Sequence, residues 1–239
     1  MNKIIKVYLA IKNEKYLIIS LPIALLFVPI IILIKNIILL RFGLIHSDRI
    51  GHFITDTALY LIDKKKNFKK RKLFDFLYFP KTISNQQIEK MWRRKIFIGS
   101  IYLIRPFWLI FNFFNLRAHL AGISETGPRD IKNLIPKNKN IIKFTNEEVG
   151  YCKDILKKNK IDEKKIVLII LRDNNYLRAM MTNKSKIKNF DYHNFRNVNI
   201  KTYKKAIQFL LKKNYHVIRM GKYLKKKLPI NNNRYIELF

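Results

Sequence analysis

The first pattern along the chain is an uncharged, almost wholly apolar run over residues 17–34, which extends past one lysine to Leu40. At about 1.5 Å per residue, a helix of this length can cross the hydrocarbon core of a bilayer. Pro22 and Pro29 lie inside the run and would kink such a helix or turn it back. An in-plane or re-entrant anchor and a buried core helix therefore stay open as alternatives. We predict a membrane anchor over residues 1–41.

After the apolar run, segments with a helical pattern alternate with segments typical of strands. Apolar positions at helical spacing predict an amphipathic helix over about residues 52–63. Residues 73–79 are typical of a strand, and Ser84 is the expected N-cap of the next helix. The candidate core positions of the first helix are Phe53, Ala58, Leu59 and Ile62. These elements indicate an α/β domain.

A second apolar stretch covers residues 96–116 and is rich in aromatic residues. Arg105 near its centre would be costly inside a bilayer, by ~2.5 kcal/mol or more. The pattern favours an element at the membrane interface, or equally an aromatic core helix kinked at Pro106.

The second half of the chain predicts a βαβ unit. Thr145 opens a T-x-x-E pattern, which is a capping box for a helix to about Asn159. A strand at 166–171, an amphipathic helix at about 199–214 and a strand at 216–218 follow. Residues 124–140 have the composition of a linker. The predicted domains are residues 42–160 and residues 161–239.

The formal net charge of +33 is extreme for 239 residues. Such a field attracts nucleic acid, anionic lipid or a phosphorylated substrate. A compositional bias toward Lys, Ile and Asn explains most of the excess charge equally well. Nucleic acid is not expected, because no signature of such a binder is present and an apolar anchor is unusual for one. Basic residues flank the anchor on both sides, and the basic sequence after residue 60 favours a cytoplasmic body. The single Cys152 excludes an intramolecular disulfide and a cysteine-cluster metal site.

The candidate chemistry of the first half is the sequence Arg49-Ile50-Gly51-His52 at a loop-to-helix junction. Glycine lets a backbone approach a ligand, and the free N–H groups of a helix start attract anions. Arg49 adds a fixed charge, and His52 can exchange a proton near neutral pH. A purely structural role at the helix start remains the alternative.

The candidate chemistry of the second half lies at strand ends, where α/β enzymes hold anionic ligands. Arg172 and Asp173 directly follow the strand, so that Arg172 can reach a phosphate and Asp173 can orient it or bind a hydroxyl. An ordinary surface ion pair is the alternative. Four more residues are candidates for the same ligand, although each taken singly is more often structural: Tyr176, His193, Arg196 and Arg219.

These residues resemble the signatures of a family of bacterial glycosyltransferases associated with surface-polysaccharide synthesis. The sequence Arg49-Ile50-Gly51-His52, with Leu59-Tyr60-Leu61 downstream, resembles the family's N-terminal signature. Three further segments resemble its central signature in order and spacing: Arg172-Asp173-x-x-Tyr176, Tyr192-His193-x-x-Arg196-Asn197-x-x-Ile200-x-x-Tyr203, and Tyr215-x-Val217-x-Arg219-Met220-Gly221. The resemblance covers roughly residues 45–221.

The resemblance implies a GT-B-like fold, in which two Rossmann-like domains face each other across a cleft. Arg49, Gly51 and His52 would line the acceptor side, with His52 as the candidate base. Arg172 and Asp173 would face the nucleotide diphosphate of the donor, with His193 and Arg196 nearby. No metal or cofactor is expected, because cationic side chains and helix ends stabilise the departing diphosphate in such enzymes.

Two features depart from the family pattern. Some related transferases carry a histidine two positions before the strand-end arginine, where this chain has Ile170. The sequence also ends at Phe239, after one βαβ unit of the second domain, which predicts an incomplete nucleotide-sugar domain and a chain that can be inactive by itself.

The sequence therefore predicts a membrane-associated glycosyltransferase-like protein at the cytoplasmic membrane. Its substrates would be a nucleotide-sugar and a lipid-linked or polysaccharide acceptor. The alternative is a non-catalytic protein of the membrane surface that binds anionic lipid or a partner.

Overall fold

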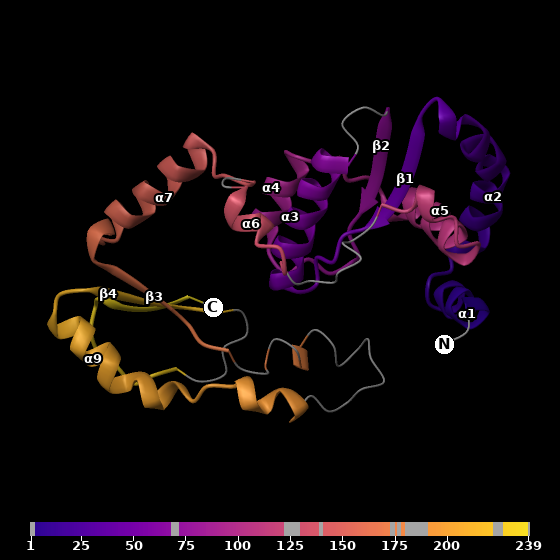
Figure 1. The fold of residues 1–239 in the computed structure, drawn as a ribbon. Helices are drawn as coiled ribbons and strands as arrows, with labels where there is room; N and C mark the ends of the chain where they lie inside the picture. The colour runs from indigo at the N-terminus through magenta and orange to yellow at the C-terminus, as the bar shows by residue number, and fades with distance from the viewer. Residues whose placement is uncertain are drawn as a thin grey trace. The chain divides into compact units, whose positions relative to one another are not determined.

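The protein has a mixed α/β fold with short parallel sheets (Figure 1). The structure is a computed structural model and describes residues 3–67, 72–121, 130–138, 141–172, 175, 178–179, 191–221 and 227–238. The chain divides into an N-terminal unit, residues 1–144, and a C-terminal unit, residues 145–239.

The N-terminal unit contains two strands and six α-helices among its described residues. In chain order its elements are α1 (Lys3–Asn13), α2 (Leu17–Leu33), η1 (Ile34–Asn36), β1 (Leu39–Leu44), α3 (Ile50–Asn67), β2 (Leu73–Tyr78), α4 (Gln86–Arg93), α5 (Ile101–Phe113), η2 (Arg117–His119) and α6 (Leu134–Lys137). The predicted helix at 52–63 and the predicted strand at 73–79 are thus confirmed as α3 and β2.

Strands β1 and β2 are parallel and are joined by α3 in a βαβ unit. Single bridges extend the pairing at both edges, from Phe42 to Leu120 and from Leu77 to Ile98. Gly43 lies where the chain around Ala121 approaches β1 most closely. A Cβ atom at position 43 would lie 2.7 Å from the Cβ and the carbonyl oxygen of Ala121, so that only glycine fits without a shift.

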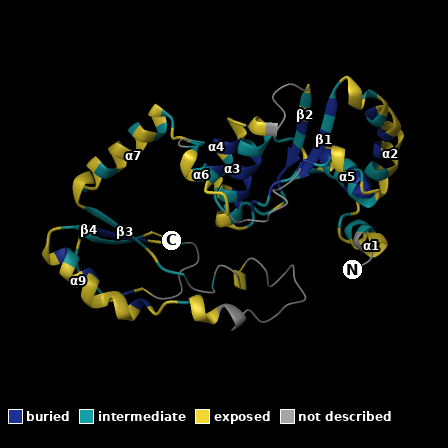
Figure 2. Ribbon diagram, in the orientation of Figure 1, coloured by how far each residue is buried: buried dark blue, intermediate teal, exposed yellow. Residues whose placement is uncertain are grey.

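The two faces of this small sheet carry two separate apolar cores. Because side chains alternate along a strand, Phe42 and Tyr78 face α2 and α5, while Ile45 and Leu77 face α3 and α4. Figure 2 shows the buried residues of both cores on either side of β1 and β2. Phe53, Ala58 and Leu59 are buried on α3 as predicted, and Ile62 is half-buried.

The apolar run at the N-terminus forms α2 but does not continue to Leu40 as predicted. The helix ends at Leu33, and Leu39 and Leu40 begin strand β1, because their backbone groups pair with β2. One stripe of α2, formed by Ala24, Val28 and Ile31, packs against the sheet and α5. The opposite face is exposed and equally apolar. The helical stretch Leu17–Asn36 is long and apolar enough to cross a membrane.

The aromatic stretch at 96–116 forms α5, which contains Pro106 and packs against α2 and β1. Its buried side includes Ile104 and Phe111, and its exposed side includes Leu103. The guanidinium of Arg105 is not isolated in an apolar region, because its Nη1 lies 2.9 Å from the Glu14 carboxylate. The helix therefore has both a core side and an exposed apolar side.

The predicted helix caps are partly right. Asn85, not Ser84, caps α4, because the Asn85 side chain accepts a hydrogen bond from the Ile88 N–H at 3.0 Å. Ser84 instead donates its backbone N–H to the Ser47 carbonyl. At Thr145 both hydrogen bonds of the predicted capping box with Glu148 are present.

The C-terminal unit contains a three-stranded parallel sheet in the order β3-β4-β5. Its elements are α7 (Asn146–Lys158), η3 (Glu163–Lys165), β3 (Ile166–Ile170), η4 (Asp191–Arg196), η5 (Ile200–Tyr203), α9 (Lys204–Lys212), β4 (His216–Met220) and β5 (Tyr235–Leu238). Ile207, Leu211 and Val217 form the core between α9 and the sheet. The predicted βαβ unit is confirmed, and β5 adds a strand that was not predicted.

Candidate functional site

The most complete candidate site is the loop between β1 and α3, at the carboxyl end of a parallel strand. The loop is held by three hydrogen bonds to the end of β2 and the chain that follows it, two from backbone groups of the loop and one from a side chain. Ile45 N–H donates to the Tyr78 carbonyl at 3.0 Å, and Ser84 N–H donates to the Ser47 carbonyl at 2.7 Å. The buried Ser47 hydroxyl donates to the Thr82 carbonyl at 2.8 Å. The loop is therefore a fixed support for the residues at the helix start.

Helix α3 begins at Ile50, directly after the predicted residue Arg49, and its first turn contains Gly51 and His52. The Arg49 carbonyl accepts a hydrogen bond from Phe53 N–H at 2.9 Å, which closes the first helical turn. Gly51 is exposed, and a Cβ added there would meet no atom within 4 Å. The first turn of an α-helix has N–H groups without intrahelical partners, and Gly51 belongs to that turn of this 18-residue helix. Such groups carry partial positive charge and suit an oxyanion or hydroxyl ligand.

His52 forms a pair with a carboxylate one turn further along α3. Its Nδ1 lies 3.1 Å from Asp56 Oδ2, and the His52 side chain is partly exposed while Asp56 is buried. A carboxylate only accepts hydrogen bonds, so Nδ1 carries the donated proton, and in the neutral imidazole Nε2 then has a lone pair. This geometry orients His52 to accept a proton from a ligand.

Two further residues of this site were not singled out from the sequence. Asp56 could have been found, because positions four apart lie together on a helix face and His52 is a candidate base. His46 lies in the loop, and its ring centroid is 6.2 Å from that of His52. Only the fold indicates His46, because loop geometry determines the direction of its side chain. One oxygen of Asp56, Oδ1, is buried and has no hydrogen-bond partner among the described residues.

A second charged cluster lies on the α3 face of the sheet, toward the C-terminal end of α3. Arg41 donates two hydrogen bonds to Asp75, at 2.7 and 3.0 Å, and the two residues are register partners on β1 and β2. Tyr60 and Lys64 of α3 also donate to the Asp75 carboxylate. Burial alone would raise the pKa of Asp75, but these hydrogen bonds outweigh burial and lower it.

This Asp75 cluster is a structural tie between α3 and the strands. Burial and the neighbouring Asp75 charge raise the pKa of the Tyr60 hydroxyl well above its ordinary value, so Tyr60 stays a donor. Every member is buried or partly buried, and Tyr60 and Lys64 lie toward the end of α3 opposite to His52. The cluster therefore fixes the helix whose other end carries the candidate site.

In the C-terminal unit, β3 ends at Ile170, one residue earlier than predicted, and Leu171 separates it from Arg172. The Arg172 backbone carbonyl accepts a hydrogen bond from Val198 N–H at 3.0 Å. This bond brings the chain after η4 to the carboxyl end of β3. Arg196, at the end of η4, is exposed, with its guanidinium carbon 5.2 Å from the Phe195 ring centroid. Asp173, Tyr176 and the side chain of His193 lie outside the described part of the chain.

Arg219 lies within the sheet and is only 3% exposed. Its Nη1 donates to Glu237 Oε1 on β5 at 2.9 Å, and the Tyr235 hydroxyl donates to the same oxygen at 2.7 Å. Burial would raise the pKa of Glu237, but the hydrogen bonds from Tyr235 and Arg219 lower it. In this structure Arg219 links β4 to β5. Its assignment to a substrate stays a prediction.

Apart from Arg219, the candidate residues that the structure describes form two groups, one at the start of α3 and one near the carboxyl end of β3. Among the residues that the structure describes, no group of three His, Cys, Asp or Glu side chains is arranged to hold a metal ion. No protein-family model, curated protein or solved structure matches the chain.

Proposed function

We propose that this chain is a membrane-associated glycosyltransferase-like protein that transfers a sugar from a nucleotide-sugar to a lipid-linked or polysaccharide acceptor. The observation that carries the proposal is the start of α3. There an oriented histidine, an arginine and an open glycine backbone lie together at the carboxyl end of a parallel strand. They are the residues in which the sequence resembles the glycosyltransferase signature.

The proposed architecture is GT-B-like. Each of the two compact units contains a parallel sheet with a crossover helix, α3 in the N-terminal unit and α9 in the C-terminal unit. In both units the candidate residues follow the carboxyl end of a strand, where ligands bind in open α/β sheets. This arrangement supports an acceptor site in the first unit and a nucleotide-sugar site in the second.

In the proposed reaction, an acceptor hydroxyl attacks the anomeric carbon of the donor sugar. The hydroxyl proton passes to Nε2 of His52 while the new carbon–oxygen bond forms. The bond between the anomeric carbon and the diphosphate oxygen breaks, and the nucleoside diphosphate leaves with the electron pair. Arg172 and Arg196 stabilise the charge of this leaving group. Asp56 is a positioning residue, because it holds the proton on Nδ1 of His52.

The exposed apolar face of α2 supports a location at the cytoplasmic membrane. The helix presents Ile19, Ile23, Leu26 and Leu33 on its outer side. Leaving such a face in water is unfavourable by about 25 cal/mol per Å² of apolar surface. Lys12 and Lys15 precede the helix and suit anionic headgroups.

A transfer assay tests the proposal. Membranes containing the full chain are incubated with radiolabelled nucleotide-sugars, and label is measured in the lipid and polysaccharide fractions. We expect transfer by the wild type and a loss on the order of 10²-fold or more for His52→Ala, as for removal of a general base. Ile54→Ala is the matched control, because Ile54 is exposed on the same helix and has no role in the proposed chemistry.

The outcomes separate the proposed enzyme from a membrane-surface protein without catalytic function. The exposed apolar faces of α2 and α5, together with the net charge of +33, favour that second candidate. It predicts binding to anionic vesicles with no transfer of any sugar tested. Equal transfer by the wild type and His52→Ala would instead remove His52 from the mechanism.

A further inference from the structure

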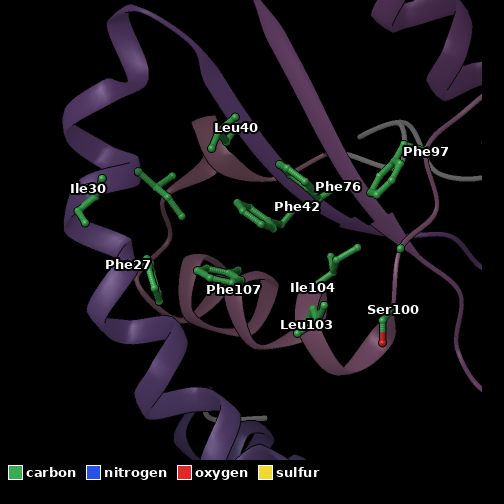
Figure 3. Close-up of a pocket in the computed structure, with 12 residues that line it drawn as sticks. Phe27, Ile30, Leu40, Phe42, Phe76, Phe97, Ser100, Leu103, Ile104 and Phe107 are labelled. Atoms are coloured by element: carbon green, nitrogen blue, oxygen red, sulfur yellow. The ribbon is translucent and has the colours of Figure 1, made fainter.

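An apolar cavity of about 370 Å³ lies between α2, α5 and the sheet of the N-terminal unit (Figure 3). Phe27 of α2, Phe42 of β1 and Phe107 of α5 contribute their rings to it, and Leu103 lies at its edge. The volume is at the lower end of the roughly 300–1,000 Å³ that small-molecule sites occupy. The cavity is large enough to receive a ligand segment.

The lining determines what kind of segment fits. Apart from Ser100, every side chain that lines the cavity is a hydrocarbon, and the remaining lining residue is Gly99. The Ser100 hydroxyl oxygen already accepts a hydrogen bond from Tyr102 N–H at 3.2 Å, as the N-cap of α5. A polar ligand group placed here would lose its hydration without a partner, at a cost of several kcal/mol. The cavity therefore favours a hydrocarbon.

The rim of the cavity is also apolar. Leu103 is 71% exposed and Phe27 is 52% exposed, although both line the cavity. Both belong to helices whose outer faces are exposed and apolar. If these faces lie against a bilayer, a hydrocarbon chain passes from the bilayer into the cavity without crossing water.

The position of the cavity relates it to the candidate site. Its wall at residues 97–100 runs beside the carboxyl end of β2, because Leu77 pairs with Ile98 and the Gly99 N–H donates to the Leu77 carbonyl. Strands β1 and β2 are parallel, so His52 lies after the same edge of the sheet. The cavity is on the α5 face of that sheet, and α3 is on the other face.

We propose that this cavity binds a hydrocarbon chain of a membrane lipid. The chain can come from a lipid-linked acceptor, such as a long-chain polyprenyl phosphate, or from a bulk phospholipid. Binding of an acceptor chain rests on the proposed function. It would make the acceptor lipid-linked, and the polar end of the acceptor would lie at the edge of the sheet where His52 lies. Chain binding itself does not require sugar transfer.

Photo-crosslinking tests the proposal on the full chain in vesicles that contain a trace of a phospholipid with a photoreactive acyl chain. We expect labelling of peptides around residues 97–107, measured by mass spectrometry. Leu103→Trp should reduce this labelling about tenfold, because the larger ring fills the cavity edge. Leu26→Trp is the matched control and should label like the wild type, since Leu26 is 75% exposed on the same apolar surface but does not line the cavity.

Competition and a second variant complete the test. Phe27→Gln should reduce labelling by placing a polar group at the rim, relative to Leu26→Gln. If polyprenyl phosphate displaces the photoreactive lipid at a lower concentration than unlabelled phospholipid does, the cavity binds the acceptor chain. If both displace it equally, the cavity binds the chains of bilayer lipids. The proposal is overturned if Leu103→Trp is labelled as strongly as the wild type, or if neither lipid displaces the label. It is also overturned if these apolar faces are buried in a dimer. Because no outcome depends on sugar transfer, failure here is distinguishable from failure of the proposed function.

Discussion

At the residue scale, Gly51 allows stability and function to be separated. Glycine is unfavourable inside a helix, but here the space around its missing Cβ is open. We expect Gly51→Ala to raise the free energy of unfolding by up to about 1 kcal/mol, as helix propensity dictates. The added methyl group should at the same time lower sugar transfer, because it occupies the space proposed for the acceptor. Thermal unfolding and the transfer assay measure the two effects.

Gly150→Ala is the matched control for Gly51→Ala. Gly150 lies in α7, and an added Cβ there also meets no atom within 4 Å. It should stabilise the protein by a similar amount and leave transfer unchanged. If Gly51→Ala also leaves transfer unchanged, the helix start does not contact the acceptor.

Asp75 predicts how stability depends on pH. Its pKa is lowered by hydrogen bonds from Arg41, Tyr60 and Lys64 despite burial. Since the folded pKa lies below the unfolded value of about 4, the carboxylate stabilises the fold above that pH. This contribution is lost as the pH falls through the folded pKa. Urea unfolding should therefore show stability decreasing below about pH 4.

Asp75→Asn tests the assignment of this acid dependence. The substitution should cost roughly 3–5 kcal/mol near neutral pH, because it leaves Arg41 buried without its counter-charge. It should also flatten the loss of stability in acid. Asp63→Asn removes one carboxylate from α3 and serves as the control. If Asp75→Asn loses stability in acid as the wild type does, groups other than Asp75 cause the loss.

At the scale of elements, the two sides of α2 have different roles. Val28 is buried against the sheet, and Leu26 is exposed on the outer face. We expect Val28→Ala to lower the free energy of unfolding by about 1–3 kcal/mol through lost burial and a small cavity. Leu26→Lys should leave that free energy nearly unchanged and weaken binding to lipid vesicles about tenfold or more, because it removes ~1.5–3 kcal/mol of apolar contact. Vesicle sedimentation and chemical unfolding measure the two properties.

The reverse result would contradict the proposed membrane face. If Leu26→Lys binds vesicles as the wild type does, the outer side of α2 does not meet lipid. If it destabilises the protein as much as Val28→Ala, the outer side of α2 contributes to the fold.

Elements could be predicted from sequence where one local rule decides them. Thr145 and Glu148 bond to each other's backbone groups, and α3, β2 and β4 follow their apolar periodicity. The strand character of Leu39 and Leu40 could not be predicted, since it depends on pairing with β2, 34 residues away. For the same reason the contact of Arg41 with Asp75 was not visible in the sequence. The sequence predicted a candidate site at the start of a helix. The place of His46 beside His52 could be seen only from the geometry of the loop.

At the scale of the whole molecule, the net charge of +33 has two consequences. A positive field of this size favours polyanionic partners, among them the proposed anionic lipid and nucleotide diphosphate, and salt would weaken both proposed interactions. The charge itself does not distinguish an enzyme from a surface protein. That distinction depends on whether the start of α3 and the carboxyl end of β3 act on one substrate pair.

The most direct measurement of this central claim is the distance between the two candidate groups in the full chain. With the exposed Cys152 replaced by serine, spin labels at Ile54→Cys on α3 and Lys201→Cys on η5 report on the two units. A label pair at Ile54→Cys and Lys66→Cys, both on α3, is the rigid control. We predict that adding UDP or GDP shortens and narrows the distance between the units and leaves the control unchanged. A broad distance distribution that neither nucleotide alters would contradict joint action of the two candidate groups on one substrate pair and, with it, the proposed transfer.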